Sequence, residues 1–156
     1  MKPRFVADCN VGRLARWLRA LGYDATYHHQ IGDAELVRRA LAERRVLLTR
    51  DRDLMQRRPI STGLVQALLL RDDRVREQLR QVVAELGLGR ERCFSRCLEC
   101  NLELLLAPPE AVRDRVPPYV AATQTAYAEC RRCGRVYWAG THQARMRGFL
   151  EASAGG

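Results

Sequence analysis

Lysine is almost absent from this sequence of 156 residues. Lys2 is the only lysine, and it precedes the first apolar segment of the chain. Enzymes that transfer phosphate to an aspartate on an α/β sheet usually need a lysine beside that aspartate, so the sequence disfavours this chemistry. The sequence also contains no G-K-[ST] motif, which argues against a phosphate-binding P-loop.

Long apolar runs and targeting signals are absent as well. No segment approaches the roughly 20 apolar residues that a membrane-spanning helix requires. The apolar stretch before Asp8 is too short for the core of a signal peptide. The six cysteines suit metal binding in a reducing compartment better than a disulfide framework. We therefore expect a cytoplasmic protein that has no membrane partner.

The charge of the chain is strongly positive and almost entirely due to arginine. There are 27 basic and 18 acidic residues, which give a formal net charge of +9. A basic surface favours a polyanionic partner, and arginine both binds phosphate with paired hydrogen bonds and stacks on bases. The alternative is a basic surface that serves solubility only. With 47% apolar and 29% charged residues, the chain has the composition of a globular protein.

The first half of the chain alternates between short apolar segments and amphipathic segments. We predict strands at residues 4–7, 24–27, 46–49 and within 63–70. We predict helices at residues 12–21, after residue 32 and at 75–86. Strands that alternate with helices indicate an α/β domain with a parallel sheet. The glycine-rich residues 87–90 mark a boundary, so we expect one domain over residues 1–90 and a smaller one over residues 91–156.

Aspartates follow the first three predicted strands, and one more, Asp72, follows the fourth. Asp8 ends the first strand, Asp33 follows the second, and Asp51 and Asp53 follow the third. Because the carboxyl ends of parallel strands meet at one edge of a sheet, we expect these carboxylates to converge there. Carboxylates that lie close together repel one another unless a cation neutralises them, and Mg²⁺ or Mn²⁺ is the usual cation. Such an ion activates water for attack on a phosphodiester.

Each of these aspartates also has a structural explanation. Asp33 and Asp53 stand where helix caps are common, and Asp51 stands where turn residues are common. Asp8 is harder to explain in this way, because a charge at the end of a buried strand needs a partner. The functional interpretation therefore depends on the four residues together.

Arginines accompany the aspartates along the chain. Arg13, Arg16 and Arg19 lie on the first predicted helix, and Arg50 and Arg52 follow the third predicted strand. As a group we expect them to bind the phosphates of a nucleic acid that flank the metal site. For any single arginine, a solvated helix face is the alternative.

Four cysteines form two C-x-x-C knuckles in the second half of the chain. Cys97 pairs with Cys100 and Cys130 pairs with Cys133, so that four thiolates are available to a tetrahedral zinc ion. A closed set of four protein ligands leaves no open position, and we therefore expect structural rather than catalytic zinc. Cys93 is an alternative ligand at a less usual spacing.

Basic and aromatic side chains surround the second knuckle. They can clamp single-stranded RNA, or they can pack the zinc-binding part onto the first domain, and the sequence leaves both roles open. These residues are Arg131, Arg132, Arg135, Tyr137, Trp138 and His142.

Several segments of the chain resemble a known family. Residues 5–19 (FVADCNVGRLARWLR) and 47–52 (LLTRDR) are similar to two signatures of the Mut-seven C-terminal RNase family, a branch of the PIN-like nucleases. Residues 96–101 (RCLECN) and 130–142 (CRRCGRVYWAGTH) are similar to its zinc-ribbon extension. The resemblance covers nearly the whole chain. It implies a PIN-like three-layer α/β/α nuclease domain over residues 1–90, followed by a zinc ribbon over residues 91–156.

The resemblance also implies which acidic residues serve the reaction. Asp8 and Asp51 are the firmest matches, and Asp33 is the third, with Glu35 as a rival on the same helix turn. The fourth position is Asp53, which matches the broader PIN pattern. The alternative to it is Asp72, which follows the fourth predicted strand.

We therefore predict a metal-dependent endoribonuclease that hydrolyses RNA phosphodiester bonds at an acidic Mg²⁺ or Mn²⁺ site. The zinc ribbon would assist the binding of a single-stranded or structured RNA partner. The resemblance implies products that end in 5′-phosphate and 3′-hydroxyl. The alternative prediction is a non-catalytic adaptor that binds RNA or protein through its zinc ribbon.

Overall fold

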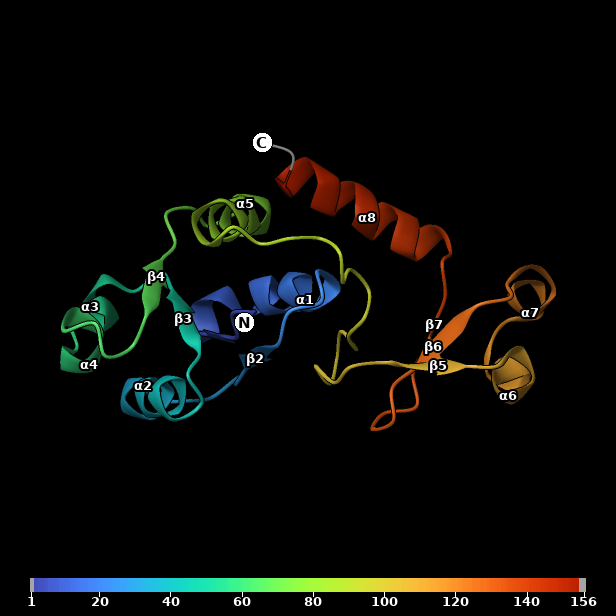
Figure 1. The fold of residues 1–156 in the computed structure, drawn as a ribbon. Coiled ribbons are helices and arrows are strands. Elements are labelled where there is room, and N and C mark those ends of the chain that lie inside the picture. Colours follow the sequence, from blue (N-terminus) through green and yellow to red (C-terminus); the bar gives the residue numbers. More distant parts are fainter. Residues whose placement is uncertain (1, 155–156) are drawn as a thin grey trace.

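The computed structural model describes residues 2–154 of the chain (Figure 1). The first half contains four strands: β1 (Phe5–Ala7), β2 (Ala25–Tyr27), β3 (Val46–Thr49) and β4 (Ala67–Leu69). They form a parallel sheet in the order β2-β1-β3-β4. Each strand lies within its predicted segment, and the predicted α/β fold with a parallel sheet is confirmed.

Helices connect these strands. A short 3-10 turn, η1 (Cys9–Val11), leads into α1 (Gly12–Ala20), and α2 (Asp33–Ala42) precedes β3. Two single-turn helices, α3 (Arg52–Met55) and α4 (Arg58–Ser61), lie between β3 and β4, and α5 (Val75–Leu86) follows β4. Gly87, in a left-handed conformation with φ 62°, ends α5.

The side chains of the central strands alternate between two hydrophobic cores. Phe5 and Leu48 lie in the core beneath α1 and α5, whereas Val6 and Leu47 lie in the core beneath α2, α3 and α4. All four side chains are fully buried. Because each face of the sheet is covered by helices, the first half of the chain has the predicted three layers, α/β/α.

The second half contains a small antiparallel sheet. Its strands are β5 (Leu105–Ala107), β6 (Tyr127–Glu129) and β7 (Val136–Tyr137), in the order β5-β6-β7. Between β5 and β6 lie α6 (Pro109–Val112), the 3-10 turn η2 (Arg113–Arg115) and α7 (Pro118–Thr123). A proline occupies the first position of α6 and of α7. The N–H at this position has no partner within a helix, so proline costs no hydrogen bond there. A separate core of Ala107, Val112, Val120 and Tyr127 holds this part together.

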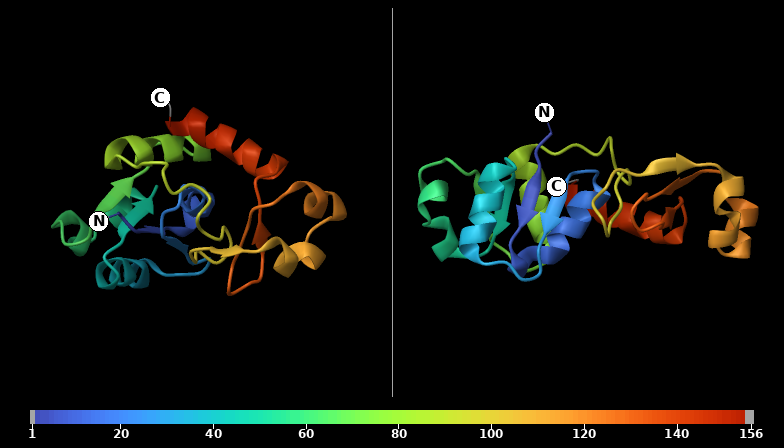
Figure 2. Two further views of the ribbon diagram at one scale, coloured as in Figure 1. Left: turned by 45° about the vertical axis from the view of Figure 1, so that its right-hand side comes forward. Right: turned by 90° about the horizontal axis from the view of Figure 1, so that it is seen from below.

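The last helix, α8 (Thr141–Ala154), returns to the parallel sheet and packs against α5. Figure 2 shows the antiparallel sheet with α6 and α7 at one end of an elongated molecule, and α8 running from there back to α5. Met146 and Leu150 of α8 are buried in the core beneath α1. Trp17 stacks on Phe149 with 3.9 Å between the ring centroids. No helix among the described residues is long and apolar enough to cross a membrane.

Candidate active site and metal centre

The two cysteine knuckles have the same local geometry. In the first, the N–H of Asn101 donates to the carbonyl of Cys97 (2.9 Å), and in the second the N–H of Gly134 donates to the carbonyl of Cys130 (2.9 Å). Asn101 and Gly134 both follow the second cysteine of their knuckle, and both have positive φ (68° and 73°). Asparagine and glycine are the residues that accept this left-handed conformation most readily. The turns are therefore formed by the local sequence.

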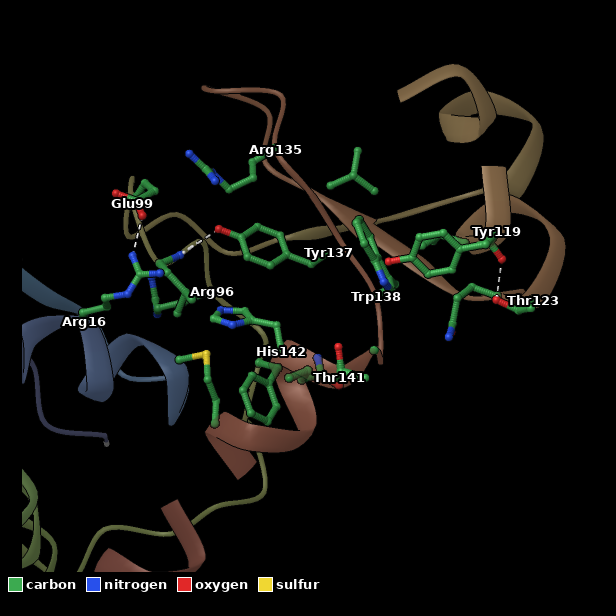
Figure 3. A pocket seen from close by; sticks show the side chains of 18 residues that line it. Arg16, Arg96, Glu99, Tyr119, Thr123, Arg135, Tyr137, Trp138, Thr141 and His142 are labelled. Atoms are coloured by element: carbon green, nitrogen blue, oxygen red, sulfur yellow. Dashed lines mark hydrogen bonds and ion pairs between the residues drawn. The ribbon is translucent and has the colours of Figure 1, made fainter. Parts of the chain in front are cut away.

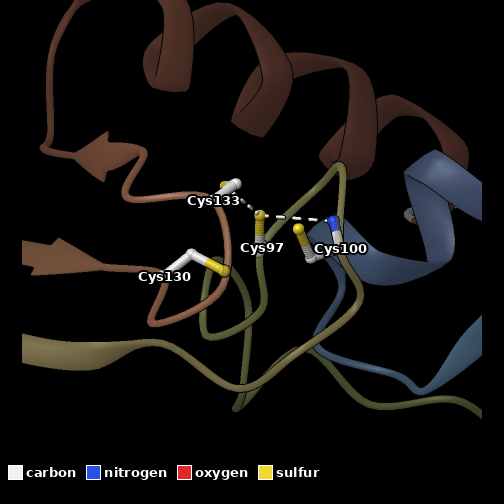
Figure 4. A group of neighbouring side chains, drawn as sticks. All are labelled: Cys97, Cys100, Cys130 and Cys133. Atoms are coloured by element: carbon white, nitrogen blue, oxygen red, sulfur yellow. Dashed lines mark hydrogen bonds between the residues drawn. The ribbon is translucent and has the colours of Figure 1, made fainter.

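The knuckles bring their four thiols together (Figure 4). The sulfur atoms of Cys97, Cys100, Cys130 and Cys133 all lie within 4.8 Å of one another. Among the described residues, no other group of three or more His, Cys, Asp or Glu side chains is placed to hold a single ion. A set of four thiolates suits zinc, and it closes the coordination sphere. The predicted four-cysteine metal centre is thus present, while Cys93 lies outside it.

Hydrogen bonds prepare this centre for a cation. The hydroxyl of Tyr137 lies 3.2 Å from the sulfur of Cys97 and accepts a hydrogen bond from the N–H of Leu98 (3.1 Å). Burial acts to raise the pKa of Cys97. Hydrogen bonds from the Tyr137 hydroxyl and from the N–H groups of Cys100 and Glu99 outweigh burial and lower that pKa to about 7. A thiolate is the form that binds metal, so these hydrogen bonds favour the ligand.

The first knuckle is attached directly to the edge of the parallel sheet. Asn101 accepts a hydrogen bond from the N–H of Ala25 at the start of β2 (3.0 Å) and donates to Asp24 (2.7 Å). Arg19 of α1 donates to the carbonyls of Ala25 and Leu98 (2.8 Å each). The metal centre is therefore fixed to the α/β layers.

The first knuckle contacts the start of β2, whereas the acidic candidates follow the carboxyl ends of the parallel strands. The connection from β1 to β2 covers one face of the sheet with α1, and the connection from β2 to β3 covers the other face with α2. The point between β1 and β3, where the connections diverge, is where ligands bind in open α/β sheets. Asp8 follows β1 and Asp51 follows β3, so they flank this point.

Thr49 links the two principal aspartates. Its hydroxyl donates to Oδ2 of Asp8 (2.7 Å) and accepts from the N–H of Asp51 (3.0 Å). The other oxygen of Asp8 accepts from the N–H of Cys9 (2.7 Å). Asp51 caps α3, because its carboxylate accepts from the N–H groups of Asp53 (2.8 Å) and Leu54 (3.3 Å). The capping role considered for Asp53 therefore belongs to Asp51, and the N-cap of α2 is Gly32 and not Asp33.

The charge of Asp33 reaches Cys9, the residue that follows Asp8. Although Cys9 is exposed on the whole, partial desolvation of its thiol raises the pKa, and the charges of Asp8 and, more weakly, of Asp33 raise it further. Asp33 is the first residue of α2 and forms only a long ion pair with Arg57 (4.0 Å). Asp53, in the first turn of α3, is exposed.

The rival acids are each bound to an arginine. Glu35 forms ion pairs with Arg38 (2.6 Å) and Arg39 (2.9 Å), and these hydrogen bonds lower its pKa. Asp72 forms an ion pair with Arg74 (2.8 Å), which also lowers its pKa. Local cations therefore already neutralise both rival acids.

The five predicted RNA-binding arginines fall into two groups. Arg13, Arg50 and Arg52 are exposed, and within residues 2–154 none of them forms an ion pair. Arg16 forms an ion pair with Glu99 beside the first knuckle. Arg19 donates hydrogen bonds to backbone carbonyls of β2 and of the first knuckle. These bonds explain it better as a link between α1 and the first knuckle than as a phosphate ligand.

Sequence reasoning assigned no role to Thr49. The signal that could have revealed it is a hydroxyl at the end of a strand that is otherwise apolar and buried. Thr49 itself is fully buried, and a buried hydroxyl needs a hydrogen-bond partner.

The fold and its two sites define a class of protein: an α/β protein with a parallel sheet, acidic groups at the sheet's switch point, and a four-cysteine, zinc-ribbon-like metal centre. A family model, the Mut7-C RNAse domain, matches residues 3–150. The chain therefore belongs to the Mut7-C RNAse domain family, as its sequence motifs had suggested. Comparisons with curated proteins and with solved structures gave no match.

Proposed function

We propose that this protein is a metal-dependent endoribonuclease whose reaction takes place at the carboxyl edge of the parallel sheet. The observation that carries the proposal is the buried carboxylate of Asp8 beside the switch point, held by the hydroxyl of Thr49, which also accepts from the backbone N–H of Asp51. Membership of an RNase family indicates a nuclease-like role and RNA as the substrate class. The dependence on metal and the roles of single residues are the further content of the proposal.

The side chains at this edge fit a divalent cation such as Mg²⁺ or Mn²⁺. Asp8 is only 4% exposed, and within residues 2–154 it belongs to no ion pair. Burying a carboxylate without a cation is costly, so a cation near Asp8 would offset that cost. Mg²⁺ typically takes one or two protein carboxylates and completes its shell with water and phosphate oxygens. Asp8 and Asp51 would be those carboxylates, with Asp33 and Asp53 as the further acidic candidates.

A bound divalent cation would supply activation of water and stabilisation of the leaving oxygen. The protein's own groups prepare this chemistry. The N–H of Cys9 and the hydroxyl of Thr49 hold the carboxylate of Asp8 in one orientation. Arg13, Arg50 and Arg52 project exposed guanidinium groups from the elements around the edge, where they would bind the phosphates on either side of the cleaved bond.

Replacement of Asp8 by asparagine tests this assignment. Asp8→Asn keeps the size of the side chain and an acceptor for the Thr49 hydroxyl, but it removes the charge. We expect RNA cleavage in the presence of Mn²⁺ to fall by about a hundredfold or more, with RNA affinity retained. Asp114→Asn, at an exposed aspartate of η2, is the matched control and should cleave normally.

The outcome against the proposal is an Asp8→Asn protein, freed of contaminating nucleases and with a wild-type circular dichroism spectrum, that cleaves as fast as wild type. Mn²⁺ titration followed by calorimetry gives a second measurement, because the variant should also bind Mn²⁺ more weakly.

A non-catalytic adaptor remains the second candidate. The observation that favours it is that only the cysteines, among the described residues, are grouped tightly enough to hold one ion. An adaptor binds RNA but produces no cleavage at any Mn²⁺ concentration. A nuclease cleaves with Mn²⁺ and stops when EDTA is added.

A further inference from the structure

A cavity of about 430 Å³ lies beside the second cysteine knuckle, on the side of the ribbon that faces α1 (Figure 3). The ribbon strand β7, the helix α7 and the first turn of α8 line it. Its aromatic walls are Tyr119, Tyr137 and Trp138, with His142 at one side. Figure 3 shows that these rings come from three separate elements and surround one space.

The aromatic residues of this cavity are only partly explained by packing. Tyr137 directs its hydroxyl to the first knuckle, and Trp138 packs edge-on against Tyr127 with 6.5 Å between ring centroids. Tyr119, in contrast, is 71% exposed, whereas every other tyrosine among the described residues is buried or half-buried. Gly140 allows the chain to pass close to the indole, because a Cβ at this position would lie 2.8 Å from Nε1 of Trp138.

Arginines give the cavity an anion-binding rim. Arg135 is exposed, and within residues 2–154 it forms no ion pair. Arg16 neutralises Glu99, the carboxylate in the lining, and the two are joined by a hydrogen bond. Arg96 is held in the wall by the carbonyls of Gly22 and Asn101. The free positive charge therefore sits at Arg135, on the side of the cavity where Tyr137 lies (Figure 3).

The size of the cavity limits what can enter it. The volume lies within the range of about 300–1,000 Å³ that is typical of small-molecule pockets. A flat aromatic ligand that carries a phosphate matches both the rings and Arg135. An RNA nucleotide whose base is not paired has this chemistry.

The cavity also lies along a route from the acidic edge. The helix α1 begins at Gly12, four residues after Asp8, and Arg16 in the cavity lining stands four residues further along it. Four residues of α-helix span about 6 Å. Arg13 and Arg16 are both exposed, so an RNA strand whose phosphate is held near Asp8 by Arg13 would pass along α1 to enter the cavity.

We propose that this cavity binds one unpaired base of the RNA strand, stacked on Tyr119 and Trp138, with its phosphate on Arg135. This inference rests on the proposed function, since it assigns a recognition site for the substrate of that reaction. The cavity would make the enzyme select RNA that is single-stranded at a fixed distance from the cleavage site. The zinc centre would contribute by holding Tyr137 and the second knuckle in place.

Tryptophan fluorescence tests the proposal directly, because the chain has only two tryptophans. In a Trp17→Phe protein, Trp138 is the sole reporter. The zinc-loaded protein is titrated with a single-stranded 12-nucleotide RNA without Mg²⁺ or Mn²⁺, so that no cleavage occurs. We expect the RNA to quench Trp138, and Tyr119→Ala to weaken binding by about fivefold to a hundredfold. Tyr119→Phe should bind normally.

Two matched comparisons sharpen the assignment. Arg135→Gln should weaken binding more than Arg113→Gln, which removes an exposed arginine of η2 outside the cavity. RNAs with one abasic position identify the nucleotide that enters the cavity. Removal of that base should weaken binding to wild type, and it should cause little further loss in Tyr119→Ala because the stacked contact is already missing.

The results that overturn the inference differ from those that overturn the proposed function. If Tyr119→Ala and every abasic RNA bind as wild type does, while cleavage still requires Asp8, the cavity is not a base site and the nuclease assignment stands. If the protein cleaves no RNA, but Trp138 is quenched in a manner that depends on Tyr119, the base site stands and the nuclease assignment fails.

Discussion

At the scale of single residues, the arrangement at the acidic edge depends on Thr49. Apolar runs and their terminal aspartates were enough to predict where Asp8 and Asp51 lie. The hydroxyl that joins them was not predictable, because threonine is also a common strand residue and its partner Asp8 is 41 residues away. In the structure, Thr49 donates to one aspartate and accepts from the backbone of the other. In the proposed site it would position Asp8 and would not itself bind the cation.

Thr49→Val tests that role with a side chain of the same shape. The valine removes the donor to Asp8 and leaves a buried carboxylate oxygen without it. We expect Mn²⁺ affinity and RNA cleavage to fall by about tenfold to a hundredfold, and stability to fall by about 1–3 kcal/mol. Thr49→Ser keeps the hydroxyl and should recover Mn²⁺ affinity measured by calorimetry. Equal Mn²⁺ affinity in all three proteins would remove Thr49 from the site.

At the scale of elements, the first knuckle is held on the edge of β2 by a polar network. Asp24 accepts hydrogen bonds from Arg45 (2.6 Å) and Asn101 (2.7 Å) and, more weakly, from Arg4 (3.3 Å). Although burial acts to raise it, these partners lower the pKa of Asp24 from its ordinary 3.8 to about 2. The C-x-x-C spacing predicted the knuckle because its geometry is local. The contact with β2 joins residues 76 apart, and nothing in the local pattern indicates it.

The pKa of Asp24 predicts a pH-dependent part of the stability. The pKa is lower in the folded state, so the stabilisation is complete above the unfolded value and is lost as the pH falls from about 5 towards 2. A shift from 3.8 to about 2 corresponds to about 2 kcal/mol. The test measures the free energy of unfolding in urea for wild type and Asp24→Asn. The difference between the two proteins should become smaller by this amount between pH 7 and pH 2.

Asp114→Asn is the control for this measurement, because that aspartate is exposed on η2. Protonation of the cysteine ligands at low pH affects all three proteins alike, so the comparison between them isolates Asp24. If the difference in unfolding free energy between wild type and Asp24→Asn stays constant across the pH range, the charge of Asp24 does not contribute to stability.

At the scale of the whole molecule, the sequence predicted the layers of the fold better than the way its two halves meet. The strands β1 and β3 are continuous apolar runs, which is the pattern of a parallel sheet covered on both faces. Residues 141–154 carry a weaker signal, since the side chains that α8 buries in the core are mainly Met146 and Leu150. Arg19 was expected to bind phosphate, but in the structure it donates a hydrogen bond from α1 to the carbonyl of Leu98 in the first knuckle. Such roles depend on neighbours that only the folded chain brings close.

The return of α8 predicts that the zinc centre stabilises the parallel sheet as well as the ribbon. The chain reaches α8 only after passing through the second knuckle, and α8 places Met146 and Leu150 in the sheet's core. Structural zinc contributes about 10–16 kcal/mol of apparent binding free energy in small zinc-finger peptides. We expect Cys100→Ser, or zinc removal by a chelator, to lower the stability of the whole chain by several kcal/mol.

Trp17 reports on this coupling, because it stacks on Phe149 of α8. In a Trp138→Phe protein, the urea midpoint seen by Trp17 fluorescence should fall together with the midpoint seen by circular dichroism when zinc is lost. Cys9→Ser removes an exposed cysteine outside the group of four and should leave both midpoints unchanged. If the Trp17 midpoint stays at its original value after zinc loss, α8 and the sheet fold without the ribbon. The two halves of the chain would then be independent units, and the zinc centre would serve only the ribbon and its cavity.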